Sequence, residues 1–486
     1  MKRIPWFLLA LVLCLGCLAV AIAQDTSAGA TQIVLSDSGV AVNGAPASVD
    51  PRDAVYTAHD IVFYLAGQDF TYGEGTEADA HPQEEADAHT VLHITRPGVY
   101  ELSGKLSAGQ IAVEIPGAKK DEDAVVTLVL NGVDITSTVA PAIIFYNVYE
   151  CASDDADDAT MQVDLTHAGA NVVIADGSVN TLNGSYVARI YEPGTVELSK
   201  NGSTVKDAKK LHKYDGALYS KRSMNILGGE KGDGVLIVNA QNEGICSDLH
   251  LAIHGGDIRI TSGNDGINAS EDGVSVAMIN GGKVTVSVNG ATGEGDGVDS
   301  NGWLILNGGS LTSAAYGQSM DAGVDSDNGI HINGGTLCAT GNMFDHIAGG
   351  SAPWAVFGFA QRQAGGSEIT LKDETATAVA SWTPENDFSY LVISGDFLTP
   401  GAYTLWQGET QLGYTGGELR GFGSGMPPMG PPPEDLGNRP EPPQGFGGPR
   451  PPRGGQDEPL NAGALRTEFV LTETGGVFSG VISAVE

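Results

Sequence analysis

Acidic and amide side chains recur at fixed distances from a repeated glycine in the middle of the chain. The repeated glycines are Gly216, Gly244, Gly266, Gly297 and Gly323. The residue before the glycine is acidic in four units: Asp215, Glu243, Asp265 and Asp296. The positions two and four residues after the glycine are mostly acids or amides: Asn268, Asp299, Asp325, Asp248, Asn301 and Asp327. Such oxygen-bearing side chains can bind a hard cation if the fold stacks them.

Stacking these positions creates an electrostatic problem that either a proton or a cation can solve. Neighbouring strands lie about 4.8 Å apart, so Asp299 and Asp325 would be neighbours on one outward-facing column. Like charges directly opposite each other destabilise a sheet, and adjacent carboxylates raise each other's pKa. Oxygen ligands in flexible turns suit calcium better than magnesium. We therefore predict calcium as the cofactor, with these ligands: Asp248, Asp265, Asp296, Asp299, Asn301, Asp325 and Asp327.

Two structural explanations compete with a metal site. Asp-Gly is an ordinary turn pair, and acids on an exposed ladder also protect a sheet from edge-to-edge aggregation. We expect the position before the glycine to cap a turn more often than to bind a metal, so the two positions after it are the better ligand candidates. His250 and His254 are four residues apart, but on a predicted strand, where we expect structural histidines rather than zinc ligands.

A second repeat defines the elements that would position these residues. Gly-Gly pairs begin at Gly228, Gly255, Gly281, Gly308 and Gly334, which are 27, 26, 27 and 26 residues apart. Apolar residues alternate with polar ones on both sides of each pair, as in strands with one buried face. Each coil of about 26 residues therefore has three predicted strands: one after the acidic unit's glycine, one before the Gly-Gly turn and one after it.

Three short strands per coil can pair only with their counterparts in the next coil, in parallel. We predict an all-β fold, a right-handed parallel β-helix (β-solenoid). The alternative, a β-sandwich, would not keep so constant a repeat. Asn280, Asn307 and Asn333 share one position before the Gly-Gly turn, and we expect them to form an amide ladder.

The domain organisation follows from composition. Residues 1–23 have a basic start, an apolar stretch and a small-residue cleavage site, so we predict a secretory signal peptide. The alternatives are an uncleaved anchor and a lipid anchor on Cys17. We assign 24–94 to an N-terminal segment, 95–415 to the β-helix, 416–460 to a disordered Gly/Pro-rich loop, and 461–486 to a C-terminal strand returning to the β-helix. No other stretch is long and apolar enough to span a membrane.

The net charge and the cysteine content limit which binding partners and which cysteine sites we expect. The chain has 25 basic and 60 acidic side chains and a net charge of -35, which repels nucleic acid and anionic lipid. Removing Lys2 and Arg3 with the signal peptide would take this to -37. Beyond that peptide only Cys151, Cys246 and Cys338 remain, and we expect neither a disulfide nor a metal site from them. We expect a monomer.

Several ordered phrases of the chain resemble secreted bacterial carbohydrate-binding proteins with a pectate-lyase-like β-helix that bind calcium. The matching stretches are residues 98–115, 128–143, 217–229, 243–267 and 295–311. The resemblance implies binding of plant-wall or similar acidic polysaccharide, with calcium held between coils. The chain departs from the family pattern at Asn268, Ser270 and Ala322, where neighbouring coils offer acids, and in the stretch 146–160.

Three functions are compatible with these features. The first is a secreted, non-catalytic, calcium-dependent polysaccharide binder, in which Trp303, Tyr316 and Trp354 either stack on sugar rings or pack at coil edges. The second is a polysaccharide lyase, which needs a base near the metal; the candidates are Lys221, Arg222 and Arg259, of which the first two also fit simple salt bridges to the acids. The third is a structural or adhesive surface repeat with no sugar site.

Overall fold

The computed structural model describes residues 29–416, 464–472 and 475–483. Regular structure in these ranges is almost entirely β, which confirms the all-β prediction. The helical elements described are α2 (Gln83–Asp87) and two single turns of 3₁₀ helix, Ala118–Lys120 and Ala156–Asp158. None of these helices is long and apolar enough to cross a membrane. The predicted signal peptide (1–23) and, except for Gly416, the predicted loop (416–460) lie outside the described residues.

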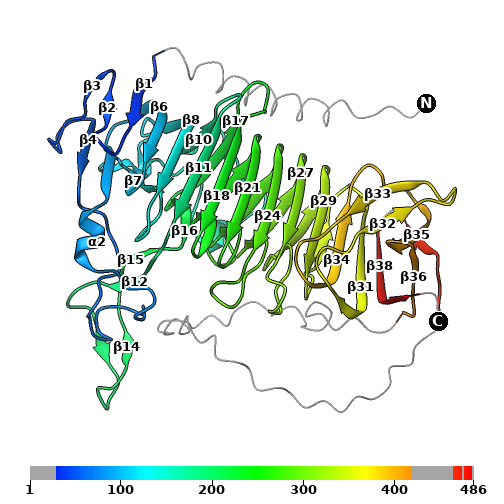
Figure 1. Ribbon diagram of the computed structural model, residues 1–486. Helices are drawn as coiled ribbons and strands as arrows, with labels where there is room; N and C mark the ends of the chain where they lie inside the picture. The colour runs from blue at the N-terminus through cyan, green and yellow to red at the C-terminus, as the bar shows by residue number, and fades with distance from the viewer. Residues whose placement is uncertain (1–28, 417–463, 473–474, 484–486) are drawn as a thin grey trace.

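Three stacks of strands run side by side along the molecule (Figure 1). The first stack consists of β4 (Val55–Ala58), β5 (Thr90–Ile94), β7 (Gly109–Glu114), β9 (Ile143–Asn147), β16 (Gly216–Ser220), β19 (Glu243–Ser247), β22 (Ile267–Ala269) and β25 (Val298–Ser300). The second consists of β1 (Thr31–Leu35), β6 (Gly98–Leu106), β8 (Val126–Thr136), β10 (Ala170–Ile174), β17 (Met224–Gly228), β20 (Leu251–Ile253), β23 (Val276–Ile279), β26 (Trp303–Leu306), β28 (Gly329–Ile332) and β30 (Ile347–Gly349). The third consists of β11 (Val179–Gly184), β18 (Val235–Ala240), β21 (Asp257–Ser262), β24 (Lys283–Val288), β27 (Ser310–Ala314) and β29 (Thr336–Gly341).

Strands of successive coils pair in parallel, with the register expected from the Gly-Gly repeat. In the second stack Ile253 pairs with Ile226 on one side and with Ile279 on the other. In the third stack Val284 pairs with Ile258 and with Leu311. The alternation of apolar and polar residues turns the apolar set inward in every coil, so equal side chains stack in columns.

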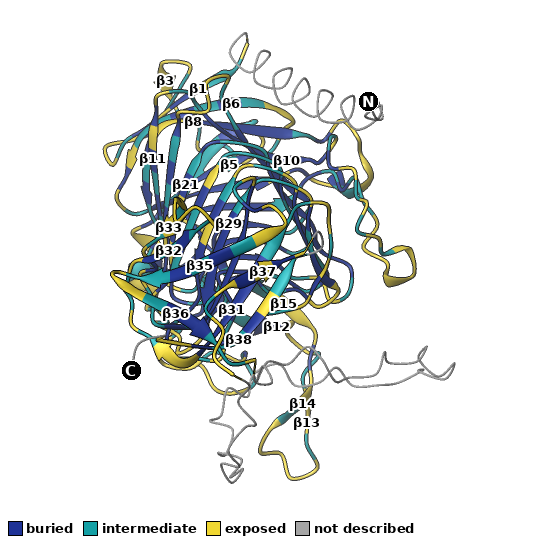
Figure 2. Ribbon diagram, turned by 90° about the vertical axis from the view of Figure 1, so that its right-hand side faces the viewer, coloured by how far each residue is buried: buried dark blue, intermediate teal, exposed yellow. Residues whose placement is uncertain are grey.

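The core is one continuous column of aliphatic side chains enclosed by the three stacks (Figure 2). Ile226, Leu236, Val284 and Ile332 are among the residues with no accessible surface. Burying each such side chain contributes roughly 1.5–3 kcal/mol relative to leaving it in water. The core fixes the register because a slip of one residue would turn these side chains outward.

The second glycine of the Gly-Gly turn is required by both conformation and space. Gly282, Gly309 and Gly335 have φ angles of +81°, +73° and +82°. A Cβ at Gly309 would lie 2.6 Å from the carbonyl oxygen of Gly282 in the preceding coil. Only glycine satisfies both constraints, and this explains why the pair recurs at the coil period.

The two ends of the stacks are built differently from the coils. At the first end β4 pairs antiparallel with β5, and a two-part hairpin projects outward, formed by β12 (Val187–Tyr191), β15 (Lys210–Tyr214), β13 (Glu197–Leu198) and β14 (Val205–Asp207). At the other end β34 (Phe388–Ser394) pairs antiparallel with β29 and β31 (Trp354–Gln363).

A second, separate core lies beyond that antiparallel pairing. It contains β32 (Ile369–Lys372), β33 (Ala378–Trp382), β35 (Gly401–Gln407), β36 (Thr410–Tyr414), β37 (Phe469–Leu471) and β38 (Gly476–Ser483). β37 pairs with β35, and β38 pairs with β31 and β36. The parallel stacks themselves begin before residue 95, since β1 pairs with β6 and β5 with β7.

Candidate functional site

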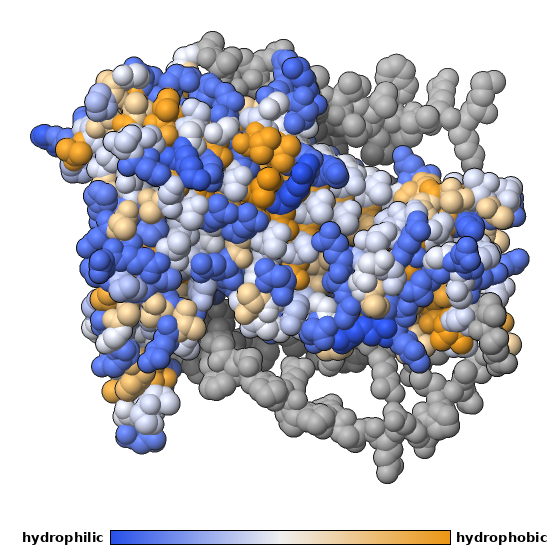
Figure 3. All heavy atoms as spheres, in the orientation of Figure 1, coloured by the Kyte–Doolittle hydropathy of each residue, from blue (hydrophilic) through white to orange (hydrophobic). Residues whose placement is uncertain are grey.

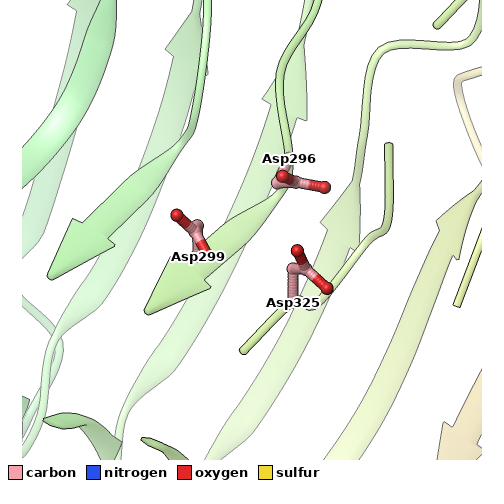
Figure 4. Close-up of side chains that lie close together, drawn as sticks. All are labelled: Asp296, Asp299 and Asp325. Atoms are coloured by element: carbon pink, nitrogen blue, oxygen red, sulfur yellow. The ribbon is translucent and has the colours of Figure 1, made fainter. Parts of the chain in front are cut away.

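Three carboxylates converge where the first stack ends (Figure 4). Asp296 precedes β25, Asp299 lies within it, and Asp325 belongs to the next coil. Val298 and Val324 form a parallel bridge, and the Asp325 N–H donates to the Val298 carbonyl at 2.8 Å. This pairing places Asp299 and Asp325 on neighbouring rungs. One carboxylate oxygen from each of the three residues lies within 4.8 Å of the others.

The residue before the repeated glycine both caps the turn and belongs to the acidic group. The Asp296 N–H donates to Asp265 Oδ1 at 2.8 Å, and the Ala322 N–H donates to Asp296 Oδ1 at 2.5 Å. Each acid therefore binds the backbone of the following coil at the same position. We expected the residue before the repeated glycine to cap a turn more often than to bind a metal, and its hydrogen bonds are of this capping kind. The Asp296 carboxylate also belongs to the convergent group.

The acids continue along the stack on either side of this group. On the side of the earlier coils, the Asn268 amide nitrogen donates to Glu243 Oε1 at 3.1 Å and to Asp265 Oδ2 at 3.2 Å. On the side of the later coils, Asp345 is close enough to Asp325 to raise the pKa of its carboxyl. We call these residues the acidic column: Glu243, Asp265, Asn268, Asp296, Asp299, Asp325 and Asp345.

Burial and mutual repulsion raise the pKa values of carboxyl groups in the acidic column. Burial, followed by the charges of Asp265 and Asp325, raises the pKa of Asp299 to about 8. Burial and then Asp345 raise the pKa of Asp325 to about 6. Burial and then neighbouring acids also raise the pKa values of Asp265 and Asp296 well above their usual range. The ion pairs of the described residues involve none of these carboxylates.

Three buried oxygens of the acidic column have no hydrogen-bond partner in the structure. They are Glu243 Oε2, Asn268 Oδ1 and Asp345 Oδ2. A buried acceptor left unsatisfied costs about 1–3 kcal/mol. All three are oxygens, and they flank a group of carboxylates, so the donor set fits a hard cation with oxygen ligands. The donor atoms present are therefore of the chemical type that calcium prefers.

The remaining predicted ligands lie outside the convergent group. Asp248 Oδ1 accepts a hydrogen bond from the Tyr219 hydroxyl. The Asn301 amide nitrogen donates to the Ser270 carbonyl at 3.1 Å and to Asp272 Oδ1 at 2.7 Å. The predicted residues Asp248, Asn301 and Asp327 do share one position of the coils, as expected, with Ser270 in the coil between Asp248 and Asn301.

Burial and then the charge of Asp272 raise the pKa of the Asp327 carboxyl. Asp327 is exposed in the structure. It therefore lies at the rim of the acidic column, near Asp272, which is also exposed.

Asp345 and Asp272 are members of this region that repeat analysis did not find. Alignment on the glycine could not locate Asp345, because its coil has no such glycine: the sequence there is Asn342-Met343-Phe344-Asp345. The parallel bridge between Ala322 and Met343 is what brings Asp345 beside the column. Asp345 could have been found by continuing the coil repeat beyond Asp325 without requiring the glycine.

The two histidines have structural roles, as expected. His250 Nδ1 accepts from the Val276 N–H at 3.0 Å, and burial lowers the pKa of its ring to about 4. His254 Nε2 lies 3.2 Å from Asn225 Oδ1 and joins the start of an amide ladder. In that ladder Asn307 donates to Asn280, and Asn333 donates to Asn307. The side-chain amides of this ladder are therefore hydrogen-bonded to one another.

The candidate bases and aromatic residues do not meet at the acidic column. Arg259 pairs with Asp257 at 2.6 Å on the third stack. Lys221 and Arg222 form none of the ion pairs found in the described residues, so the expected salt bridges to the acids are absent there. Tyr316 and Trp354 pack against the main core, which favours the packing interpretation for both.

Comparison with known proteins identifies the chain at the family level. Residues 88–166 and 154–378 match the family described as "carbohydrate-binding domain-containing protein". The chain belongs to this family. The entire acidic column of this carbohydrate-binding family member lies within the matched residues 154–378.

One curated protein and one solved structure are similar to this chain. A carbohydrate-binding domain-containing protein of Acetivibrio thermocellus is 29% identical over 170 residues, which cover 35% of this chain and 44% of the relative. The alignment thus spans less than half of the relative's length. The solved structure of the polysaccharide lyase-like protein from C. thermocellum, a gadolinium derivative, is 20% identical, with a TM-score of 0.35. That comparison covers 66% of this chain and 92% of the other.

Proposed function

We propose that this chain is a secreted, non-catalytic protein that binds polysaccharide in a calcium-dependent manner. Its ligand would be an acidic or plant cell-wall polysaccharide. Membership of a carbohydrate-binding family supports the glycan partner. The observation that supports calcium is the acidic column, in which Asp296, Asp299 and Asp325 converge beside buried acceptor oxygens that have no hydrogen-bond partner.

Asp296, Asp299 and Asp325 would hold the ion, and the neighbouring acids would reinforce its binding through their charge. Bound calcium would supply the positive charge that a uronate carboxylate needs on a chain of net charge -35. The turn hydrogen bonds from the Asp296 and Ala322 N–H groups fix the orientation of two carboxylates across coils. The site is therefore pre-organised by the backbone, which reduces the ordering cost of binding.

The architecture that we propose for this function is a right-handed parallel β-helix of the pectate-lyase-like kind. The continuous parallel register of the three stacks supports it. We further propose a signal peptide at 1–23, a β-helix domain that extends the expected 95–415 toward the N-terminus to include β1 and β5, a Pro/Gly-rich loop and a returning C-terminal strand. An extracellular location would give the acidic column access to abundant calcium.

A native affinity gel cast with polygalacturonate tests the proposal. We expect the purified chain to be retarded in calcium and to migrate freely in a chelator, with the polymer intact. A gel without polymer, run with the same calcium, controls for retardation by calcium alone. A cleared zone of degraded polymer would instead establish a lyase. Unchanged mobility in every gel would contradict binding to this uronan and favour a structural repeat.

A further inference from the structure

A groove crosses four coils on the outer face of the second stack, and its volume is about 350 Å³. Two rows of side chains and the segment 161–166 line it. The first row belongs to paired strands and consists of Ala252, Met278, Ile305 and His331. The second row stands two residues further along in each coil and consists of His254, Asn280, Asn307 and Asn333. We call this site the amide groove.

The segment 161–166 is fixed against the second stack and forms one wall of the amide groove. The Asn225 side-chain amide donates to the Leu165 carbonyl at 2.8 Å. Leu165 is also buried in a small cluster with Ala252, against which Met278 packs. The wall directly follows the stretch 146–160, where the chain departs from the family pattern. The groove is therefore a feature of this chain that the coil repeat alone does not produce.

The asparagines of the second row use only part of their hydrogen-bonding capacity in the ladder. Asn307 donates to Asn280 Oδ1 at 2.7 Å and accepts from Asn333 Nδ2 at 2.8 Å. A side-chain amide has two N–H donors and an oxygen with two lone pairs, so Asn307 keeps a donor and an acceptor for a ligand. Asn307 and Asn333 are exposed, so a ligand in the groove can reach them.

The amide groove has no positive charge that would attract an acidic sugar. Among the described residues that line it, none is a lysine or an arginine, and Asp164 is the one carboxylate. Burial lowers the pKa of His254, so this ring is neutral at pH 7. The net charge of the chain, -35, would repel an anion from such a site. The ligand that fits the groove is therefore uncharged.

A hollow over the third stack shows what is special about the amide groove. This hollow also has an amide ladder, in which Asn239 donates to Asn183 Oδ1 at 2.8 Å. Figure 3 views the molecule over this stack, where most of the surface is hydrophilic or near neutral. Among the described residues that line the hollow, Ala240 is the one with an apolar side chain. In the amide groove, by contrast, Met278 and Ile305 each stand beside an asparagine.

We propose that the amide groove binds a chain of N-acetylated sugars. An acetamido group has one N–H, one carbonyl oxygen and one methyl group. The Asn307 amide would accept from this N–H and donate to this oxygen, and Met278 and Ile305 would contact the methyl group. The same pair of positions recurs in the next coil, about 4.8 Å away. A polymer that repeats the acetamido group can therefore use more than one coil.

This site goes beyond the proposed function. Membership of a carbohydrate-binding family supports a glycan as the general ligand class, but the amide groove uses neither calcium nor the acidic column. The acidic column follows the first stack, whereas the groove lies on the outer face of the second. The two sites can therefore be tested separately.

Calorimetric titration of the whole chain with chitohexaose in a chelator tests the amide groove. Cellohexaose is the matched probe, because it has the same length and linkage but a hydroxyl in place of each acetamido group. We expect chitohexaose to bind roughly tenfold more tightly than cellohexaose. Equal affinity for the two probes, or binding of neither, would overturn the proposal.

Substitution of the exposed asparagines locates the site. Asn307→Ala removes a donor and an acceptor for the acetamido group and should weaken chitohexaose binding roughly tenfold. Asn333→Ala, at the end of the ladder, should also weaken it. The matched control is Asn239→Ala, which removes an exposed amide from the ladder of the third stack and should leave the affinity unchanged.

Thermal unfolding of each variant identifies those that are folded. Unaltered affinity of folded Asn307→Ala and Asn333→Ala, or an equal loss in Asn239→Ala, would overturn the assignment to the amide groove.

Outcomes with polygalacturonate separate this proposal from the proposed function. Chitohexaose binding in the chelator, without calcium-dependent retention of polygalacturonate, would support the amide groove and contradict the proposed function. Calcium-dependent retention of polygalacturonate, without chitohexaose binding, would overturn the amide groove alone.

Discussion

One column of side chains on the first stack has opposite chemistry at its two ends. Successive rungs place Ile144, Tyr219, Cys246, Asn268 and Asp299 at the same position, and Asp325 follows. The backbone pairing is parallel throughout. The early rungs are apolar and aromatic, whereas the late rungs are amide and carboxylate. The coil geometry therefore sets the spacing, and the side chains alone decide what each end can bind.

Carboxylates near the early rungs have a cationic or hydroxyl side-chain partner, while Asp299 and Asp325 of the late rungs accept only backbone hydrogen bonds. Asp215 pairs with Lys213 at 3.0 Å, and Asp248 accepts from Tyr219. Asp299 and Asp325 have no cationic partner among the described residues, and their pKa values are raised to about 8 and about 6 by burial and by neighbouring acids. A site of unmet charge is where an external cation gains most.

The largest expected effect is loss of calcium affinity after Asp299→Asn with Asp325→Asn. Two of the three convergent carboxylates lose their charge, so we expect affinity to fall on the order of a hundredfold. Calorimetric titration of calcium into the chelator-stripped chain measures it. Asp248→Asn, a carboxylate with its own hydroxyl donor, is the matched control and should bind calcium normally. An equal loss of calcium affinity in the double variant and in Asp248→Asn would contradict the difference between the early and late rungs.

The second effect is a pH dependence that appears only without calcium. Folded Asp299, with a pKa of about 8, retains its proton where the unfolded chain, with a usual value of 3.8, has lost it. The folded state thus binds more protons between about pH 4 and pH 8, so stability falls as the pH rises through that window. Thermal unfolding in a chelator should show the fall, and calcium should reverse it.

The same double substitution sharpens this second prediction. With Asp299→Asn and Asp325→Asn, two repelling charges are removed, so the decline in stability with pH should be shallower in the chelator. A decline of unchanged slope would mean that other acids cause it.

A smaller effect is expected at the early rungs. Tyr219→Phe removes the hydroxyl donor to half-buried Asp248 and should lower the free energy of unfolding by about 1–3 kcal/mol, the usual cost of an acceptor that loses its partner away from water. Calcium affinity should stay within about twofold, because this carboxylate is outside the convergent group. Denaturant unfolding and calcium titration measure the two quantities. A marked drop in calcium affinity would show that the ion contacts the early rungs.

The smallest effect marks the rim of the site. Asp327 is exposed and contributes no oxygen to the convergent group. Asp327→Asn should therefore reduce calcium affinity less than about threefold, since solvent screens a charge at this position. The effect should diminish at high salt, and a tenfold loss that persists in salt would place Asp327 among the ligands.

The sequence predicted what repeats and missed what departs from the repeat. The Gly-Gly spacing located the strands and the stacked aliphatic columns, because a positive φ and close approach of the preceding coil demand glycine at residues such as Gly309. The acidic units likewise predicted that Asp299 lies beside Asp325, because both residues stand two positions after the repeated glycine of their coil. Asp345 was missed because its coil lacks the repeated glycine. Asp248 lies outside the group because it follows β19, two coils before Asp299. Its hydrogen bond from the Tyr219 hydroxyl is a contact between coils that no spacing within the chain reveals.

Crystals of the chain soaked in calcium and, separately, in chelator provide the most direct test of the central claim. The anomalous difference map should show one peak among Asp296, Asp299 and Asp325, with oxygen atoms about 2.4 Å away, in the calcium crystals only. The account would be contradicted by a calcium crystal with no peak at these carboxylates, whether or not a peak lies elsewhere on the molecule.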